Sequence, residues 1–258
     1  MGGHCRRFKG VIIIHRFFAD NLDIAGGKIT LTGENAAHAA VLRLKVGEEI
    51  IVCDCKACDY HCLVDSMAKD EVRVKVVDIK ANTAEPSVLV TIFQGLPKGD
   101  KMEEIVEKCV ELGVYRIVPI VTARCVAKSS PRDAKKAARW QKIAEAAAKQ
   151  SQRGILPQVS GLLKFDEALQ LANEHDVAFV CYELEDKLML KNLLKFLPNK
   201  ITSLAFFIGP EGGFTDEEAA KFAENNITIA SLGRRILRTE TAGAAVLANV
   251  LYEMEGRP

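Results

Sequence analysis

The sequence predicts an α/β fold in two parts, a small N-terminal β domain at residues 1–80 and a C-terminal α/β domain at residues 81–258. Two observations lead to this prediction. Up to residue 79, short alternating apolar segments are separated by glycines, which is typical of a small sheet or barrel. After Pro86, continuous apolar segments alternate with helical patterns, which indicates a mostly parallel sheet.

In the N-terminal part, the alternating segments predict strands at 28–31, 49–53, 60–64 and 72–76. A helical pattern at 34–42 follows Thr32 and Gly33 and predicts one helix. The polar stretch 78–86 ends at Pro86 and is therefore predicted to link the two parts.

In the C-terminal part, residues 88–94 form a continuous apolar run rich in β-branched side chains, which favours a strand buried on both faces. Further strands are predicted at 116–121, 177–181, 204–208 and 227–231. Helices are predicted at 101–112, 132–151, 166–174, 187–197, 216–225 and 241–254. This alternation is the pattern of parallel strands joined by crossover helices.

Composition and charge exclude several classes of protein. Of 258 residues, 48% are hydrophobic and 27% charged, which excludes a disordered chain, and no apolar run approaches the roughly 18 residues of a membrane span. No secretory signal is recognised, so we expect a cytoplasmic protein with reduced thiols. The net charge is +1, but residues 124–153 carry nine basic and two acidic side chains. Because polyanions respond to local fields, the near-neutral total does not exclude a nucleic-acid partner.

The stretch FFIGPEGGFTDEEAAKF at 206–222 is the strongest local feature. A predicted strand ends at Ile208, a glycine-rich turn follows, and Thr215 is placed to cap the next helix. Ligands of open α/β sheets bind beyond the carboxyl ends of strands, where glycines let the backbone approach them. The alternative is an ordinary strand–turn–helix corner.

The stretch LGRRILRTETAGAAVLANVLYEM at 232–254 has a similar plan. A predicted strand ends at Gly233, three arginines follow, and Thr239 or Thr241 is placed to cap an apolar helix. Positive charge beside a helix N-terminus suits an anionic or electron-rich partner. The alternative is a solvated basic loop.

Taken together and in this order, GPEGG, LG and RTETA resemble the SPOUT class of RNA methyltransferases, and most of all the ribosomal RNA small subunit methyltransferase E family. The resemblance covers nearly the whole chain, because it extends to HRFFAD (15–20), GENAAHAAVLRLKVGEEIIVCD (33–54), LPKGDKMEEIVEKCVELGVYRIVPIVTARCVAK (96–128) and RWQKIAEAAAKQSQR (139–153). Residues 1–14 exceed the family's usual start; an additional strand, a targeting remnant and a vector-derived extension all stay open.

The resemblance implies a PUA-like β-barrel followed by a SPOUT domain with a deep trefoil knot, acting as a homodimer. It implies S-adenosylmethionine as cofactor, no metal, and methylation of N3 of a uridine in 16S ribosomal RNA, which we expect to be presented in an assembled small subunit. The residues that it assigns to the cofactor are Tyr182, Glu183, Ile208, Gly209, Pro210, Glu211, Gly212, Gly213, Leu232, Gly233, Ile236, Leu237, Thr241 and Ala242.

Uridine N3 carries a proton near neutral pH, so either a base removes that proton or a cation stabilises the anionic ring. Arg238 is our catalytic candidate, because its charge can orient and activate the uracil. Glu240 is a second candidate, either as a general base or as the structural partner of an arginine.

The basic segment predicts contacts with RNA phosphates. The candidates are Arg124, Lys128, Arg139 and Arg153, together with Arg16 and Arg43 from the N-terminal part. For some of these charges the alternative is a solvated helix face. A non-catalytic RNA-binding or ribosome assembly factor with the same fold is the rival function, and the intact GPEGG and LRTETA loops disfavour it.

Cys53, Cys55, Cys58 and Cys62 form a cluster that allows three interpretations: structural cysteines, which we favour, a metal site, or redox-sensitive thiols. If 56–59 is the turn, Cys53 lies opposite Cys62. We expect no metal, because the cluster lacks two separated CxxC knuckles. Cys109 and Cys181 fall in apolar patterns and are predicted to lie in the core.

Overall fold

The structure, a computed structural model, describes residues 14–20, 22, 24, 26–125, 133–198 and 200–255. The chain forms two compact units, one up to Asn82 and one from Thr83, and each has its own apolar core. The predictions for residues 1–13 and for Lys128 lie outside the described residues. Among the helices described, none is both long enough and apolar enough to cross a membrane.

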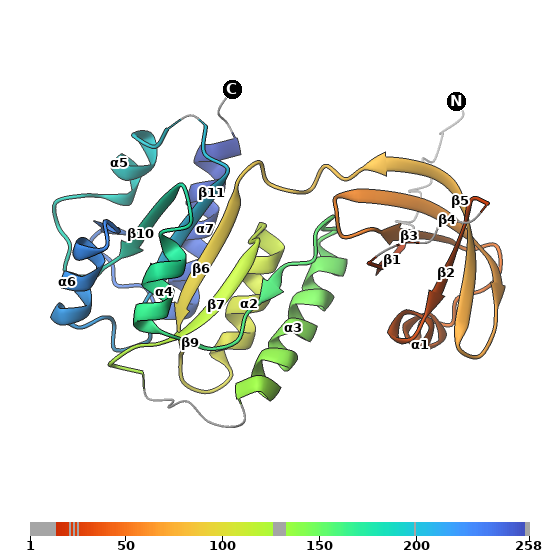
Figure 1. The fold of residues 1–258 in the computed structure, drawn as a ribbon, viewed down its shortest axis with the longest axis horizontal. Helices are drawn as coiled ribbons and strands as arrows, with labels where there is room; N and C mark the ends of the chain where they lie inside the picture. Colours follow the sequence, from red (N-terminus) through yellow and green to blue (C-terminus); the bar gives the residue numbers. More distant parts are fainter. Residues whose placement is uncertain are drawn as a thin grey trace, which may run out of the picture. The chain divides into compact units, whose positions relative to one another are not determined.

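The first unit is a curled five-stranded sheet with one helix (Figure 1). Its elements are β1 (His15–Phe18), β2 (Lys28–Thr32), α1 (Glu34–Val41), β3 (Glu49–Cys53), β4 (Cys58–Met67) and β5 (Glu71–Ala81). The strand order is β1-β3-β4-β5-β2, with β1 parallel to β3 and the other pairs antiparallel. The sheet curls into a half-barrel with β1 and β2 at its two ends, which agrees with the predicted small β-sheet or barrel.

Alternating burial explains why the sequence forms this sheet. In β2 the side chains of Ile29 and Leu31 are buried, whereas the residues between and beside them are exposed. Ala36 and Ala39 of α1 are buried where the helix packs against β2 and β5. The predicted strands and helix of this part are confirmed, and β1, which buries Phe17, is an additional strand.

The predicted linker at 78–86 is wrong at its beginning. β5 continues to Ala81 because β4 extends back to Cys58, so that Tyr60 pairs with Ile79 and Cys58 with Ala81. The side chain of Ile79 is 54% exposed. Residues 78–81 have the polar composition of a linker because the side chains at the end of β5 face solvent, although the backbone there is paired with β4.

The second unit is a seven-stranded parallel sheet with helices on both faces (Figure 1). Its strands are β6 (Leu89–Gly95), β7 (Arg116–Val121), β8 (Gln158–Val159), β9 (Leu163–Lys164), β10 (Val177–Cys181), β11 (Ser203–Ile208) and β12 (Thr228–Ala230). Its helices are α2 (Lys101–Leu112), α3 (Asp133–Gln150), α4 (Phe165–Ala172), α5 (Leu190–Lys195), α6 (Asp216–Glu224) and α7 (Thr239–Glu255). The strand order is β12-β10-β11-β6-β7-β8, and β9 also pairs with β7.

The predicted strands and helices of this part are confirmed, with differences of a few residues at their ends. The strands β8 and β9 were not predicted, because two residues show no periodicity. Phe93 of β6 and Phe207 of β11 stack with their ring centroids 4.5 Å apart, and Phe207 also contacts Phe222 of α6. Helices α2 and α7 pack together on the opposite face, where Gln94 approaches α7. Burial on both faces accounts for the continuous apolar runs of the central strands.

The strands β12, β10, β11 and β6 are neighbours and all parallel, so their carboxyl ends lie at one edge of the sheet. The loops that follow β10, β11 and β12 leave this edge side by side, together with the segment from β6 to α2. This is the edge at which open parallel sheets bind their ligands.

Candidate active site

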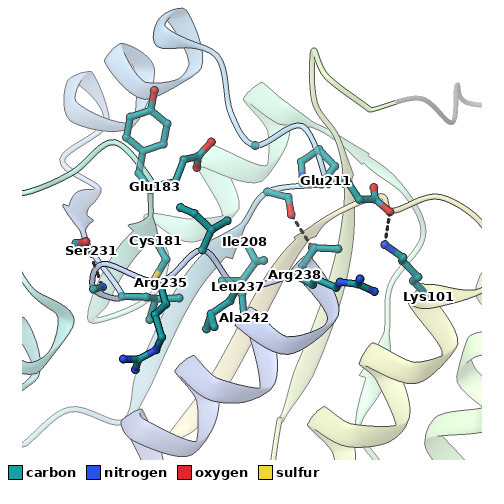
Figure 2. Close-up of a pocket in the computed structure, with 18 residues that line it drawn as sticks. Lys101, Cys181, Glu183, Ile208, Glu211, Ser231, Arg235, Leu237, Arg238 and Ala242 are labelled. Carbon is teal, nitrogen blue, oxygen red and sulfur yellow. Dashed lines mark hydrogen bonds and ion pairs between the residues drawn. The ribbon is translucent and has the colours of Figure 1, made fainter.

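A cavity of about 390 Å³ lies at this carboxyl edge (Figure 2). The loops after β10, β11 and β12 and the first residues of α2 and α7 enclose it. It is lined by Lys101, Cys181, Tyr182, Glu183, Ile208, Gly209, Pro210, Glu211, Gly213, Ser231, Leu232, Gly233, Arg235, Ile236, Leu237, Arg238, Thr239 and Ala242. Its volume lies within the range of small-molecule and cofactor sites.

The residues predicted to hold the cofactor line this one cavity, with two exceptions. Gly212 does not line it, and its carbonyl accepts a hydrogen bond from Arg124. Thr241 is exposed on α7. Arg238, predicted as catalytic, also lines it, and five further lining residues were predicted for no site role: Lys101, Cys181, Ser231, Arg235 and Thr239.

The loop after β11 requires glycine at positions where a side chain would collide. Gly213 has a φ of +67°, and a Cβ there would lie 2.0 Å from Glu183 Oε1. A Cβ at Gly209 would lie 3.1 Å from the Cα of Gly213. Gly95 is equally restricted, because its Cβ would lie 2.5 Å from Pro210 Cδ. The glycines of this loop are therefore explained by close packing of backbone around the cavity.

Side chains fix this loop at its far end. The Thr215 hydroxyl accepts the backbone N–H of Glu218, whose carboxylate accepts the N–H of Thr215, so the predicted helix cap is confirmed as a capping box. The Arg124 guanidinium donates to the carbonyls of Gly212 and Phe214, both at 2.9 Å. The loop thus enters α6 in a single defined conformation.

Thr239 joins three segments that are distant in sequence. Its hydroxyl donates to the Gly209 carbonyl at 2.7 Å and accepts from Gln94 Nε2 at 2.8 Å. Gln94 Nε2 also donates to the Gly95 carbonyl, so both amide hydrogens are used. Helix α7 consequently begins at Thr239, two residues before its predicted start. The only sequence signal for Gln94 was a polar residue at the end of an apolar strand.

Four charged side chains alternate in sign at one side of the cavity. Lys101 Nζ lies 2.9 Å from Glu211 Oε1 and 3.4 Å from Glu240 Oε2, and Figure 2 shows Lys101 directed at Glu211. Glu240 Oε1 lies 4.0 Å from the Arg238 guanidinium. The hydrogen bond to Glu211 raises the pKa of Lys101. Although burial raises it, the pKa of Glu211 is lowered overall by hydrogen bonds from Lys101 and from the backbone.

Exposure differs sharply along this array. The side chain of Arg238 is 83% exposed, whereas that of Glu240 is 10% exposed. Glu240 Oε2 is buried and makes no hydrogen bond. Arg238 is therefore accessible to a substrate that reaches the cavity, while Glu240 is held inside the protein.

The structure buries two of the predicted RNA-binding residues in ion pairs, which argues against direct contact of their side chains with RNA. Arg16 is 7% exposed and forms a bidentate pair with Asp59 at 2.7 and 2.6 Å. Arg153 is 2% exposed, pairs with Glu85 at 2.8 Å and donates to the Val110 carbonyl. A charge pattern cannot distinguish a solvated arginine from one that satisfies a buried carboxylate.

The other RNA candidates fall into three groups. Arg124 is committed to the loop carbonyls described above. Arg139 is exposed and pairs with Glu103 at 2.8 Å. Arg43 is exposed, with a φ of +55° just after α1. Lys128 lies outside the described residues.

The cysteine cluster does not have the predicted register. Cys53 pairs with Asp59, and Cys62 lies opposite Ile50, so the turn is formed earlier than residues 56–59. Asp54 causes this shift, because its carboxylate accepts the backbone N–H groups of the tight turn that follows it. Within the described ranges, no group of three or more His, Cys, Asp or Glu side chains is arranged to hold a metal ion.

Burial raises the pKa of the thiols of Cys53, Cys62, Cys109 and Cys181 to about 12. At neutral pH these thiols are protonated, which disfavours a redox-sensitive role for them. The core position of Cys109 is confirmed. Cys181 instead lines the cavity, because it is the last residue of β10.

Two family models match the chain. Residues 84–251 match a model described as an RNA methyltransferase domain, and residues 31–77 match one described as an RNA methyltransferase PUA domain. The ribosomal RNA small subunit methyltransferase E of Bacillus subtilis (strain 168) is 37% identical over 232 residues, which cover 88% of this chain and 90% of that protein.

Solved structures with the same fold include two that contain S-adenosylmethionine. A ribosomal RNA small subunit methyltransferase E from Neisseria gonorrhoeae is 30% identical with a TM-score of 0.81, covering 92% of this chain and 96% of that one. A protein from Legionella pneumophila is 27% identical, also with a TM-score of 0.81 and the same coverage.

Proposed function

This chain belongs to the ribosomal RNA small subunit methyltransferase E family, and from that premise we propose that it methylates N3 of a uridine in 16S ribosomal RNA with S-adenosylmethionine. The observation that carries the proposal is the cavity at the carboxyl edge. The glycine-rich loop after β11, the loop after β12 and an exposed arginine meet there.

The residues around the cavity fit S-adenosylmethionine. The volume is sufficient, and the lining combines apolar side chains with the backbone of two glycine-containing loops. Glycine at 209 and 213 lets the backbone pack closely around the cavity, because a Cβ there would meet Gly213 or Glu183 respectively. We assign the adenosine and methionine parts to the predicted residues that line the cavity, from Tyr182 to Ala242, and we remove Gly212 and Thr241 from that assignment. When bound, the cofactor supplies an electrophilic methyl group on its sulfonium sulfur.

The protein's own contribution is to orient the uracil and favour its anionic form. Arg238 lines the cavity and is mostly exposed, so its guanidinium can contact the uracil oxygens and stabilise negative charge on the ring. Glu240 is largely buried and lies between two cations, which supports a structural role over that of a general base. Positioning dominates such a transfer, because the nucleophile must be aligned with the bond that breaks.

We propose that RNA is held by exposed cations of both units, with Arg43 and Arg139 as the described candidates. The match of residues 31–77 to a PUA domain of RNA methyltransferases supports a role of the first unit in this contact. We also propose that the substrate is an assembled small subunit in the cytoplasm.

Two properties of the fold are part of the proposal. A trefoil knot in the second unit is proposed because the family resemblance implies one, and the segments around Gly95, Gly209 and Thr239, which contact one another beside the cavity, are compatible with it. A homodimer is proposed because the family resemblance implies one. The division into a domain up to residue 80 and one from residue 81 is likewise proposed as functional, with RNA contact in the first and chemistry in the second.

The test is ribonucleoside mass spectrometry of 16S ribosomal RNA from cells lacking the gene. We expect one N3-methyluridine to disappear and to return when the intact protein is supplied. If no uridine loses a methyl group, the reaction assigned here is wrong.

Calorimetry with S-adenosylhomocysteine separates this function from that of a non-catalytic assembly factor. We expect the enzyme to bind S-adenosylhomocysteine with a Kd of about 1 μM, which corresponds to a binding free energy of about −8 kcal/mol. An assembly factor that only retained the fold would not bind at millimolar ligand.

A further inference from the structure

We propose that Lys101 is a positioning residue of this site, which holds the Glu240 carboxylate and thereby leaves Arg238 available to the substrate. The inference rests on the proposed function, because it concerns the residue assigned to the uracil. Lys101 was not singled out by the sequence, and it contacts Arg238 only through Glu240.

The first observation is the competition for Glu240. Its side chain is only 10% exposed, so its carboxylate needs a counter-charge inside the protein. Lys101 Nζ lies 3.4 Å from one carboxylate oxygen, while Arg238 lies 4.0 Å from the other. Lys101 is therefore the closer partner, and Arg238 is held only loosely.

The second observation is the position of Lys101 in helix α2. It is the first residue of α2, and a cation at a helix N-terminus is disfavoured by the helix dipole. Two carboxylates compensate this cost, Glu211 at 2.9 Å and Glu240 at 3.4 Å. The stability of α2 alone therefore does not explain why a lysine occupies its first position.

The third observation is that Glu211 is itself fixed. Its carboxylate accepts the backbone N–H of Lys98 at 3.2 Å, in addition to its pair with Lys101. Glu211 belongs to the glycine-rich loop after β11, and Glu240 belongs to the start of α7. Lys101 thus ties these two edges of the cavity together.

The consequence concerns Arg238. If Lys101 lost its charge, the largely buried Glu240 carboxylate would lose its nearer counter-charge, and Arg238 would be the remaining cation within reach among the pairs described. Arg238 would then turn inward and pair with Glu240. Its guanidinium would be partly neutralised and withdrawn from the substrate.

The experiment compares Lys101→Met, Lys101→Arg and the double variant Lys101→Met/Glu240→Gln with the intact protein. The first readout is the rate at which phenylglyoxal modifies Arg238 in the protein without ligand, followed by peptide mass spectrometry with the exposed Arg234 as internal reference. We expect this rate to fall by about fivefold in Lys101→Met, because ion pairing protects the guanidinium, and to return in the double variant.

The second readout is methyl transfer to small subunits. We expect kcat to fall about tenfold in Lys101→Met, with S-adenosylhomocysteine affinity within about threefold. Lys101→Arg keeps the charge and should retain most of the activity, and the double variant should recover most of the lost kcat. The matched control is Lys221→Met, which removes an ion pair of 2.6 Å with Asp166 outside the cavity lining and should leave both readouts unchanged.

Several outcomes would overturn the proposal. Unchanged modification of Arg238 in Lys101→Met would show that Lys101 does not control it. A double variant no faster than Lys101→Met would show that Lys101 or Glu240 acts directly. The modification assay needs neither cofactor nor RNA, so absence of methyl transfer in the intact protein would overturn the proposed function without deciding this inference.

Discussion

At the scale of single residues, Arg238 lines the cavity and has an 83% exposed side chain. We expect Arg238→Ala to lower kcat about 100-fold while S-adenosylhomocysteine affinity changes less than about threefold, because its charge acts on the substrate. Arg234→Ala on the same loop is the control, since Arg234 does not line the cavity. Equal loss of turnover and cofactor affinity would instead make Arg238 a residue of the cofactor site.

His175 makes the stability depend on pH. Its Nε2 lies 2.9 Å from the Thr91 hydroxyl, and burial lowers its pKa below 6.5. Because the folded protein disfavours the protonated ring, the stabilisation is fully present above pH 6.5 and is lost as the pH falls toward the folded pKa. The free energy of unfolding, measured by urea titration between about pH 5 and 7, should therefore decrease as the pH falls. In His175→Gln this dependence on pH should be weaker. An identical slope in both proteins would contradict the assignment.

At the scale of elements, the close approach of the β6 end to the loop after β11 yields a prediction with a matched control. A Cβ at Gly95 would lie 2.6 Å from the backbone nitrogen of Pro210, so Gly95→Ala must displace that loop. We expect S-adenosylhomocysteine affinity to fall at least about tenfold by calorimetry. Gly161→Ala meets nothing within 4 Å and should bind as the intact protein does. Normal affinity in Gly95→Ala would separate this loop from the cofactor site.

The contact of α3 with the segment before β6 depends on one buried ion pair. Arg153 follows α3, and besides its pair with Glu85 it donates to the Val114 carbonyl at 3.0 Å. Arg153→Met leaves the Glu85 carboxylate without its charged partner, with only the backbone N–H groups of Gly154 and Ile155 still donating to it, and should lower the free energy of unfolding by about 3–5 kcal/mol. Arg139→Met removes an exposed pair and should cost less than about 1 kcal/mol. Equal effects in urea titrations would mean that burial does not set the strength of these pairs.

Burial decides which elements can be predicted from the sequence. The central strands and long helices were predictable, because burial on both faces leaves apolar runs and one buried stripe leaves a helical period. The residues around the cavity were found through motifs at strand ends. The role of Lys101 could not be predicted, because its partners Glu211 and Glu240 are more than 100 residues away in the sequence and no local pattern indicates the contact. The burial of Arg16 was not foreseen for the same reason, since its partner Asp59 is 43 residues distant.

At the scale of the whole molecule, the two units have separate cores. We expect a fragment of residues 83–258 to unfold cooperatively and to bind S-adenosylhomocysteine within about threefold of the full chain, because every residue of the cavity lining belongs to it. Its activity on small subunits should fall, since RNA contact is assigned to the first unit. A fragment that does not fold would show that its core needs the first unit.

The strand order of the second unit has a kinetic consequence. The central strands β6 and β11 pair directly, with Phe93 opposite Phe207, although 114 residues separate them along the chain. Contact order is therefore high, and proteins of this kind fold slowly because long loops must close before their contacts stabilise anything. On the ribosome, the cavity cannot assemble until α7 has emerged, since Thr239 supplies one of its walls. The chain is made from one end to the other, but its binding site can be completed only when α7 is available.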